Sequence, residues 1–245
     1  MATASVSEKD LLNAACHLGH PRNKWNPKMA AYIYGVINNV HVFDLEQTRK
    51  HLEDVCAILA KLQKEGKVVL FVSTKQQSIP YVEMFHDALS QPIVTKKWIP
   101  GLLTNWSTIK KRLKYYLDLQ SSFKTGEINK YTKKEQTQLR KQLTKLDIAL
   151  GGVAGMHGVP DALFVIDAVR DRVAVLEAKK LKIPVYGICD TNADPDLFAS
   201  CIPANDDAVK SIELIMNTVL EAMGGSQPAK KKGVKSTEGT EDADV

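Results

Sequence analysis

Three short apolar runs constrain the fold of this chain more than any other feature of its sequence. Val68–Val72, Ala162–Ile166 and Pro184–Cys189 do not alternate between apolar and polar side chains. Continuous apolar runs of this length are typical of strands buried on both faces of a parallel sheet. Helix-length segments lie between them. The sequence therefore predicts an α/β fold, a doubly wound parallel sheet with helices on both faces.

The helix-length segments carry recognisable ends. In the longest one, Asp44 is placed to cap the start, Leu45–Leu62 form one apolar face and Gly66 can end the helix. Further short strands are expected at Ile93–Val94 and Cys201–Ile202. The expected helices span residues 7–15, 44–66, 75–89, 170–181 and 206–223, the last of them N-capped by Asn205 or Asp206.

The segment Cys16–Lys28 interrupts this pattern. Its two prolines and its glycine predict an extended loop without a regular element, in which Trp25 stands among basic residues. Two short strands, Tyr32–Tyr34 and Val40–Phe43, are expected to follow around the turn at Asn38-Asn39.

Residues 105–150 are predicted to form two long helices joined by a polar turn. Gly126 can end the first helix, and the Thr132-to-Glu135 spacing matches a capping box at the start of the second. Each helix carries one apolar stripe, which predicts an antiparallel coiled-coil hairpin inserted into the sheet domain. The stripes consist of Trp106, Ile109, Leu113, Tyr116 and Phe123 on the first helix, and Leu139, Leu143, Leu146 and Leu150 on the second.

The charge of the chain is concentrated in this hairpin. Residues 105–150 hold eleven basic and four acidic side chains, a net charge of +7, whereas the whole chain carries +5. Residues 151–223 hold six basic and eleven acidic side chains, a net charge of −5. One face is therefore expected to meet a polyanion such as an RNA backbone. The alternative is a helix face that lysines merely keep soluble.

Composition limits the remaining organisation. The 245 residues are 44% hydrophobic and 25% charged, as in ordinary globular proteins, and no run of 18 apolar residues occurs. The N-terminus predicts neither a secretory signal nor a transit peptide, and the four scattered cysteines predict reduced thiols. We expect an α/β core at residues 1–104 and 151–223, the hairpin at 105–150 and a disordered tail at 224–245.

Chemistry in a doubly wound sheet is expected where the strands end. Asp167 and Asp190 directly follow their strands and offer oxygen ligands to Mg²⁺, so an Mg-dependent nucleotide-binding enzyme is an alternative function. No glycine-rich phosphate loop supports it, although a phosphate can sit at the N-terminus of the helix after Lys75. Cys16, His17 and His20 match no common zinc ligand set. A third alternative is a scaffold whose hairpin binds an acidic helix of another protein.

Several motifs resemble the bacterial-type family of ribosomal protein two of the small subunit. Gly19–Met29 resembles the N-terminal signature of that family, and Lys97–Trp106 resembles its R-W-L-G-G-x-L-T-N-W motif. Pro160–Asp167, Asp190–Pro195 and Ile202–Ala208 match in order and at the expected spacing. The resemblance covers about residues 7–222.

The resemblance implies a flavodoxin-like, or Rossmann-like, α/β domain with a protruding coiled-coil hairpin. It also implies a non-enzymatic structural role in the small ribosomal subunit, without cofactor, metal or small-molecule substrate. The implied partners are small-subunit rRNA and neighbouring ribosomal proteins, including the mRNA-binding ribosomal protein one. The implied location is the ribosome in the cytoplasm, with an organelle stroma or matrix as the open alternative.

The residues expected to contact rRNA lie in three places. They are the N-terminal signature, the approach to the hairpin and the first hairpin helix, together with one lysine after the first buried strand. The set is Arg22, Lys24, Trp25, Asn26, Lys28, Lys75, Lys96, Lys97, Trp98, Asn105, Lys110, Lys111, Arg112 and Lys114.

Overall fold

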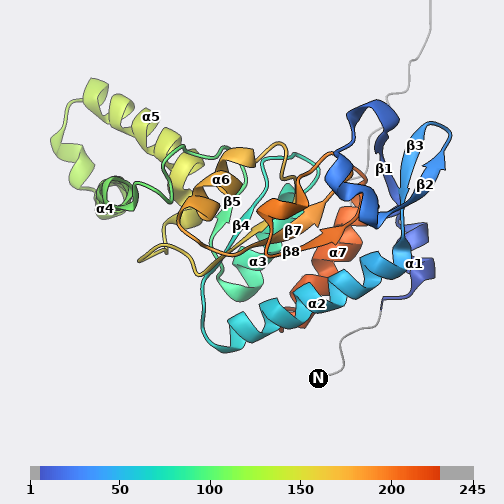
Figure 1. Ribbon diagram of the computed structural model, residues 1–245. Coiled ribbons are helices and arrows are strands. Elements are labelled where there is room, and N and C mark those ends of the chain that lie inside the picture. Colours follow the sequence, from blue (N-terminus) through green and yellow to red (C-terminus); the bar gives the residue numbers. More distant parts are fainter. Residues whose placement is uncertain (1–5, 227–245) are drawn as a thin grey trace, which may run out of the picture.

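Five parallel strands form the central sheet of the computed structural model, which describes residues 6–226 (Figure 1). The strands are β4 (Val69–Val72), β5 (Ile93–Val94), β6 (Ala162–Val165), β7 (Val185–Cys189) and β8 (Ser200–Pro203). Their spatial order is β5-β4-β6-β7-β8. Counted along the chain, this is the order 2-1-3-4-5 of flavodoxin-like sheets. The predicted parallel α/β sheet is therefore confirmed.

Helices cover both faces of this sheet. One face packs against α1 (Glu8–Asn13), α2 (Leu45–Lys64), α3 (Ile79–Leu89) and α7 (Val209–Ala222), and the other against α6 (Arg172–Lys180). Successive strand residues alternate between the two cores, because side chains of a strand point to opposite faces. Phe71 stacks on Phe85 of α3 with ring centroids 4.1 Å apart, while its neighbours in β4 join the second core.

Two helices begin later than the sequence predicts. The helix expected from Lys75 starts at Ile79, after a turn in which the Ser73 and Ser78 hydroxyl groups are hydrogen bonded. The helix expected from Asp206 starts at Val209. The Asn205 side chain accepts hydrogen bonds from the N–H groups of Asp207 and Ala208. Asn205 therefore stabilises the turn before the helix and not the first helical turn.

The prediction of a loop without regular structure at Cys16–Lys28 was wrong. The segment contains β1 (Leu18–Pro21) and η1 (Arg22–Lys24), and η2 (Pro27–Tyr32) follows. β1 pairs antiparallel with β3 (Val40–Phe43), a partner that local sequence patterns do not reveal. Proline is tolerated here because it is the last residue of an edge strand.

β2 (Ile33–Ile37) completes a second sheet of order β1-β3-β2. Asn38 and Asn39 connect β2 to β3, and both have positive φ angles, 51° and 64°. Two such residues form the type I′ turn that matches the twist of a hairpin. The two predicted strands around Asn38-Asn39 are thus confirmed.

The inserted segment forms two helices, α4 (Trp106–Thr125) and α5 (Lys133–Leu150), with the short helix η3 (Glu127–Lys130) between them. Figure 1 shows them at the end of the molecule opposite β2 and β3, with α4 nearly end-on and α5 across the view. Gly126 ends α4 with φ 81°, and Thr132 and Glu135 form the predicted capping box.

Packing between α4 and α5 is uneven. On α4 the predicted stripe residues Ile109, Leu113 and Tyr116 are buried, and Trp106 and Phe123 are half-buried, whereas on α5 only Leu150 is buried. The other α5 leucines, Leu139, Leu143 and Leu146, are half-buried. The two helices are in place, but the coiled-coil seam itself stays a prediction.

Two further predictions concern membrane-spanning helices and the C-terminal tail. Among residues 6–226, no helix combines the length and the apolar character that crossing a membrane requires. The predicted disordered tail lies, from residue 227 onward, outside the described residues.

Candidate nucleic-acid interface

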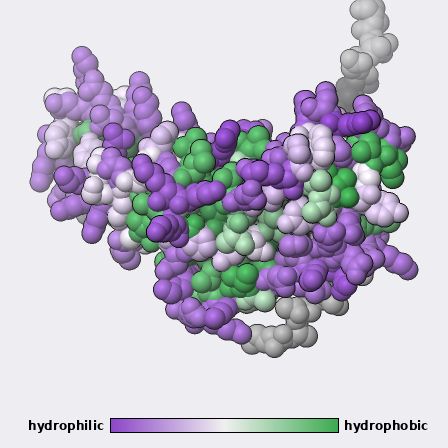
Figure 2. Space-filling view, viewed as in Figure 1, coloured by the Kyte–Doolittle hydropathy of each residue, from purple (hydrophilic) through white to green (hydrophobic). Residues whose placement is uncertain are grey.

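The outer surface of α4 and α5 is an array of exposed cations. Lys110, Lys111, Arg112 and Lys114 on α4 are all exposed, and within residues 6–226 none of them lies within ion-pair distance of a carboxylate. Figure 2 shows this end of the molecule covered mostly by hydrophilic residues. On α5 the exposed cations are Lys133, Lys134, Arg140, Lys141 and Lys145. Their mutual repulsion favours binding of a dense polyanion.

A buried carboxylate holds the loop that leads into α4. Glu177 of α6 is 9% exposed and accepts five hydrogen bonds from the loop. One carboxylate oxygen accepts from Trp98 Nε1 at 3.0 Å and from the Gly101 N–H at 2.7 Å. The other accepts from the Leu103 N–H at 3.1 Å and from the N–H and hydroxyl of Thr104.

These hydrogen bonds decide the charge state of Glu177. Burial by itself raises its pKa, but the hydrogen bonds from Trp98, Gly101, Thr104 and Leu103 outweigh burial, so the pKa lies below its usual value. An ionised carboxylate is therefore fixed inside the fold by groups of one loop. Sequence reasoning missed this residue, although a glutamate between the buried Ala174 and Ala178 on an apolar helix face was a usable signal.

The same loop separates the predicted contact residues into two groups. Lys96, Lys97 and Asn105 are exposed, and Asn105 directly precedes α4. The Trp98 side chain is only 7% exposed and packs in the core with Leu102 and Leu103. Its Nε1–H group donates a hydrogen bond to the Glu177 carboxylate. Trp98 therefore serves the architecture of the loop and is not presented to a partner.

The N-terminal signature forms a second basic surface. Arg22 and Lys24 are exposed on η1. Trp25 and Asn26 are half-buried, and the Trp25 ring lies against His41 with centroids 4.9 Å apart. Lys28 is exposed but paired with Asp194 at 3.0 Å and Asp196 at 2.6 Å, both of which raise its pKa.

Thr191, two residues after the end of β7, connects this surface to the sheet by hydrogen bonds. Its hydroxyl oxygen accepts from the His20 N–H at 2.8 Å, and its carbonyl accepts from the Asn26 N–H at 2.7 Å. A Cβ atom at Gly19 would lie 2.5 Å from Thr191 Cγ2. Only glycine allows β1 to approach the sheet this closely.

We therefore expect Gly19→Ala to weaken the attachment of the N-terminal segment. The steric conflict should cost about 1–3 kcal/mol of unfolding free energy, the range of overpacked sites. Urea unfolding would measure the loss. Gly35→Ala is the matched control, because a Cβ atom at Gly35 would have no atom within 4 Å. Equal effects of the two substitutions would contradict this account.

Lys75 lies at the topological switch point between β4 and β6, where doubly wound sheets usually bind their ligands. Its side chain is 7% exposed, and its Nζ lies 2.8 Å from Asp206, 2.7 Å from Asp207 and 3.4 Å from Asp167. His20 joins this switch-point cluster through Asp190, 3.0 Å from its Nδ1. The chain thus places its own ammonium group in the ligand position.

The burial of Lys75 among aspartates affects two predictions, the RNA contact of Lys75 and the magnesium site. Lys75 is not presented to an RNA phosphate, and the helix N-terminus expected beside it lies four residues further on. The aspartates that were candidates for Mg²⁺ do gather, and within residues 6–226 His20, Asp190 and Asp207 are close enough to share one cation. However, Lys75 already forms ion pairs with Asp167, Asp206 and Asp207, so no observation favours the nucleotide-enzyme alternative.

The charges within the switch-point cluster shift its ionisation equilibria. Burial, together with Asp190 and Asp167, raises the pKa of Asp206 to about 7, although Lys75 opposes this. For His20, the hydrogen bond with Asp190 raises the pKa and exceeds the opposing effect of burial. The cluster is therefore a site of internal charge compensation.

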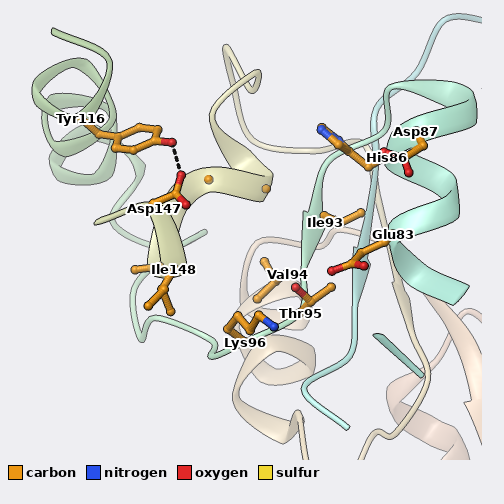
Figure 3. A pocket seen from close by; sticks show the side chains of 13 residues that line it. Glu83, His86, Asp87, Ile93, Val94, Thr95, Lys96, Tyr116, Asp147 and Ile148 are labelled. Carbon is orange, nitrogen blue, oxygen red and sulfur yellow. Dashed lines mark hydrogen bonds between the residues drawn. The ribbon is translucent and has the colours of Figure 1, made fainter. Parts of the chain in front are cut away.

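A cleft of about 420 Å³ separates α3 from the base of α4 and α5 (Figure 3). Glu83 and Asp87 line one side and Asp147 the other, where it accepts a hydrogen bond of 2.5 Å from the Tyr116 hydroxyl. Lys96 is the one lysine or arginine in the described lining of this cleft. Carboxylates on both sides make the interior of the cleft unsuited to a phosphate.

Known proteins match this chain over most of its length. A family model described as "Ribosomal protein S2" matches residues 11–225. "Small ribosomal subunit protein uS2" of a Nitratiruptor species is 43% identical over 218 residues, 89% of this chain and 82% of that protein. The protein of the same name from Thermus thermophilus is 40% identical over 224 residues, 90% of this chain and 88% of its own. The one from Marinobacter nauticus is 38% identical over 241 residues, 98% and 96% of the two chains. The chain belongs to the ribosomal protein S2 family.

Proposed function

We propose that this protein is a structural constituent of the small ribosomal subunit that binds small-subunit rRNA and so supports translation. Membership of a ribosomal protein family supports the structural, non-enzymatic role. The observation that carries the rRNA contact is the array of exposed cations on α4 and α5, which no carboxylate of residues 6–226 neutralises. Each phosphate that such an array neutralises releases condensed counterions, which favours binding.

The proposed contact surface is smaller than the predicted one. It comprises the exposed members of the predicted set, without the two buried residues Lys75 and Trp98. Trp25 and Asn26 are half-buried and support the N-terminal part. We further propose that the protein works on ribosomes in the cytoplasm and helps to hold ribosomal protein one. The exposed cations of the proposed surface are Arg22, Lys24, Lys28, Lys96, Lys97, Lys110, Lys111, Arg112 and Lys114, and Asn105 is exposed beside them.

Charge reversal on α4 tests the rRNA contact. We expect the triple variant of Lys110, Lys111 and Arg112 to glutamate to bind small-subunit rRNA at least ~100-fold more weakly at low salt. The slope of log affinity against log salt should fall by about 2–3, roughly one for each lost phosphate contact. Filter binding across a salt series would measure both quantities.

A matched control separates the contact from net charge. Lys50, Lys61 and Lys64 are exposed on α2, away from the basic helices, and their change to glutamate alters the net charge equally. This control should retain most of the affinity. If both variants lose affinity to the same extent, or if neither does, α4 is not the rRNA contact.

A further inference from the structure

The small sheet β1-β3-β2 carries an apolar face that is only partly covered: Val40 and Val42 are half-buried, and Leu18 and Ile37 are exposed. Its register pairs Leu18 with Val42, and both Pro21 and Ile37 with Val40. Paired residues share a face and so do residues two apart along a strand, so these side chains all lie on one side. Leu18 is 40% exposed and Ile37 is 56% exposed, whereas the opposite side buries Phe43 in the core.

The edge of this sheet is open as well. β2 is the outermost strand, with Tyr34 79% and Val36 46% exposed. Successive residues of an edge strand point backbone N–H and C=O groups alternately toward the neighbouring strand and away from it. Figure 1 shows this hairpin at one end of the molecule, and Figure 2 shows hydrophobic residues at that end.

Edge strands normally carry features that prevent pairing with other chains, such as a lysine, a proline or a bulge that twists the edge away. β2 contains neither lysine nor proline, and its register irregularity lies between Ile33 and Gly35, before the exposed end of the strand. No charged residue occurs from Met29 to Phe43. An open, uncharged edge beside an apolar face is the arrangement that accepts an added strand.

We propose that β2 pairs with an extended segment of another protein in the assembled small subunit. The backbone of that segment continues the sheet, and its apolar side chains extend the contact over Leu18, Ile37, Val40 and Val42. The inference rests on the proposed ribosomal role for where the partner is met. It concerns a surface distinct from the basic helices, and it shares only Arg22 and Lys24 with the proposed rRNA surface.

Side-chain chemistry favours a protein segment over RNA on this face. Single-stranded RNA is held by aromatic rings on which bases stack, and by cations along the strand. Here the face is aliphatic, Tyr34 at the edge is the exposed aromatic residue of the hairpin, and the strand itself has no cation.

Charge further specifies the segment. From Leu11 to Phe43 the sequence contains three cations and no carboxylate. Lys28 is already paired, which leaves Arg22 and Lys24, and the Arg22 N–H donates to the Asn39 carbonyl at 3.0 Å beside the hairpin turn. The segment is therefore expected to be apolar along β2 and acidic where it passes the turn.

Photo-crosslinking in intact small subunits tests the proposal. Benzoylphenylalanine would replace Ile37 in the full-length protein, and in a second variant it would replace Lys111 on α4 as the comparison site. We expect the Ile37 position to yield a product that protease removes and ribonuclease leaves intact. A product at Ile37 that only ribonuclease removes, or no product, overturns the proposal. At Lys111 we expect a crosslink to RNA, which ribonuclease removes. Absence of that crosslink would contradict the proposed rRNA contact and not the strand pairing of β2.

Hydrogen exchange shows whether the contact is strand pairing. We expect β2 amides to exchange at least ~10-fold more slowly in the subunit than in the free protein, with no such change in an Ile37→Glu variant. Ile37→Lys should retain more of the protection than Ile37→Glu, because the segment is acidic. Unchanged exchange in the wild-type subunit, or better protection with glutamate than with lysine, would overturn the proposal.

Discussion

Replacing Glu177 by glutamine is expected to destabilise the protein by about 2–4 kcal/mol and to loosen the approach to α4. Glutamine keeps one carbonyl oxygen, which can retain the hydrogen bonds from Trp98 and Gly101. Its amide N–H₂ group would then face the N–H groups of Leu103 and Thr104, which lose their acceptor. A buried donor without an acceptor costs about 1–3 kcal/mol.

Urea unfolding would measure this loss, and hydrogen exchange would locate it in residues 98–105. Glu53→Gln is the matched control, because Glu53 is half-exposed on α2 and its ion-pair partner among residues 6–226 is Arg49 at 3.4 Å. Binding to rRNA should weaken as well, since α4 starts at Trp106, directly after the loop. A change of less than 1 kcal/mol in the Glu177 variant would show that the loop does not depend on the carboxylate.

The effect of Glu177 should also depend on pH. Its native pKa lies below the usual value of 4.5, so its contribution is complete above about pH 4.5 and is lost as pH falls through the native pKa. The difference in unfolding free energy between wild type and Glu177→Gln should therefore narrow in acid. A difference that stays constant down to pH 3 would contradict this reasoning.

The second large effect is expected for Lys75→Met. Removing the ammonium group leaves Asp206 and Asp167 without their positive partner inside the fold. Breaking a buried ion pair in this way costs about 3–5 kcal/mol, and the exposure of Asp207 to water argues for the lower end, about 3 kcal/mol at pH 8. Urea unfolding between pH 5 and pH 8 would measure it.

The direction with pH follows from the carboxyl groups. Asp206 has a native pKa of about 7, above its usual 3.8, so the native state favours its protonated form. Its contribution to stability is complete below the usual value and is lost as pH rises through the native pKa. Without Lys75 this pKa rises further, so the cost of Lys75→Met should be largest at pH 8 and shrink toward pH 5.

An exposed ion pair supplies the control for Lys75. Lys67 pairs with Asp161 at 3.1 Å, and both side chains are more than a third exposed. Lys67→Met should cost less than about 1 kcal/mol and show little dependence on pH. A cost for Lys75→Met that matches this control, or that grows in acid, would show that the switch-point cluster does not need its lysine.

Local pattern was enough to predict most of the fold. The continuous apolar runs became β4, β6 and β7, because a strand covered on both faces has no polar side to display. The caps at Asp44 and Thr132 and the end of α4 at Gly126 were also predicted, since each depends on residues within one helical turn. The exposed cations on α4 were also predictable, because they are close together in the sequence and lie off the apolar stripe.

What the sequence could not show were partners far apart in the chain. β1 looked irregular because its strand character comes from pairing with β3 across about twenty residues. Trp98 and Lys75 looked like surface contacts because an indole and an ammonium group are typical of RNA-binding sites. Their actual partners, Glu177 and Asp206, lie 79 and 131 positions away.

The sequence by itself therefore determined the fold class, the helix caps at Asp44, Gly126 and Thr132, the basic helices and the family of this protein. Only the tertiary structure decided which polar groups are available to a partner. A charged side chain can be buried only where the fold places a compensating group beside it. The order of the strands decides where such groups lie, and that order depends on the whole chain. For the same reason, Lys75 fills the switch point between β4 and β6, and β2 remains an outermost strand.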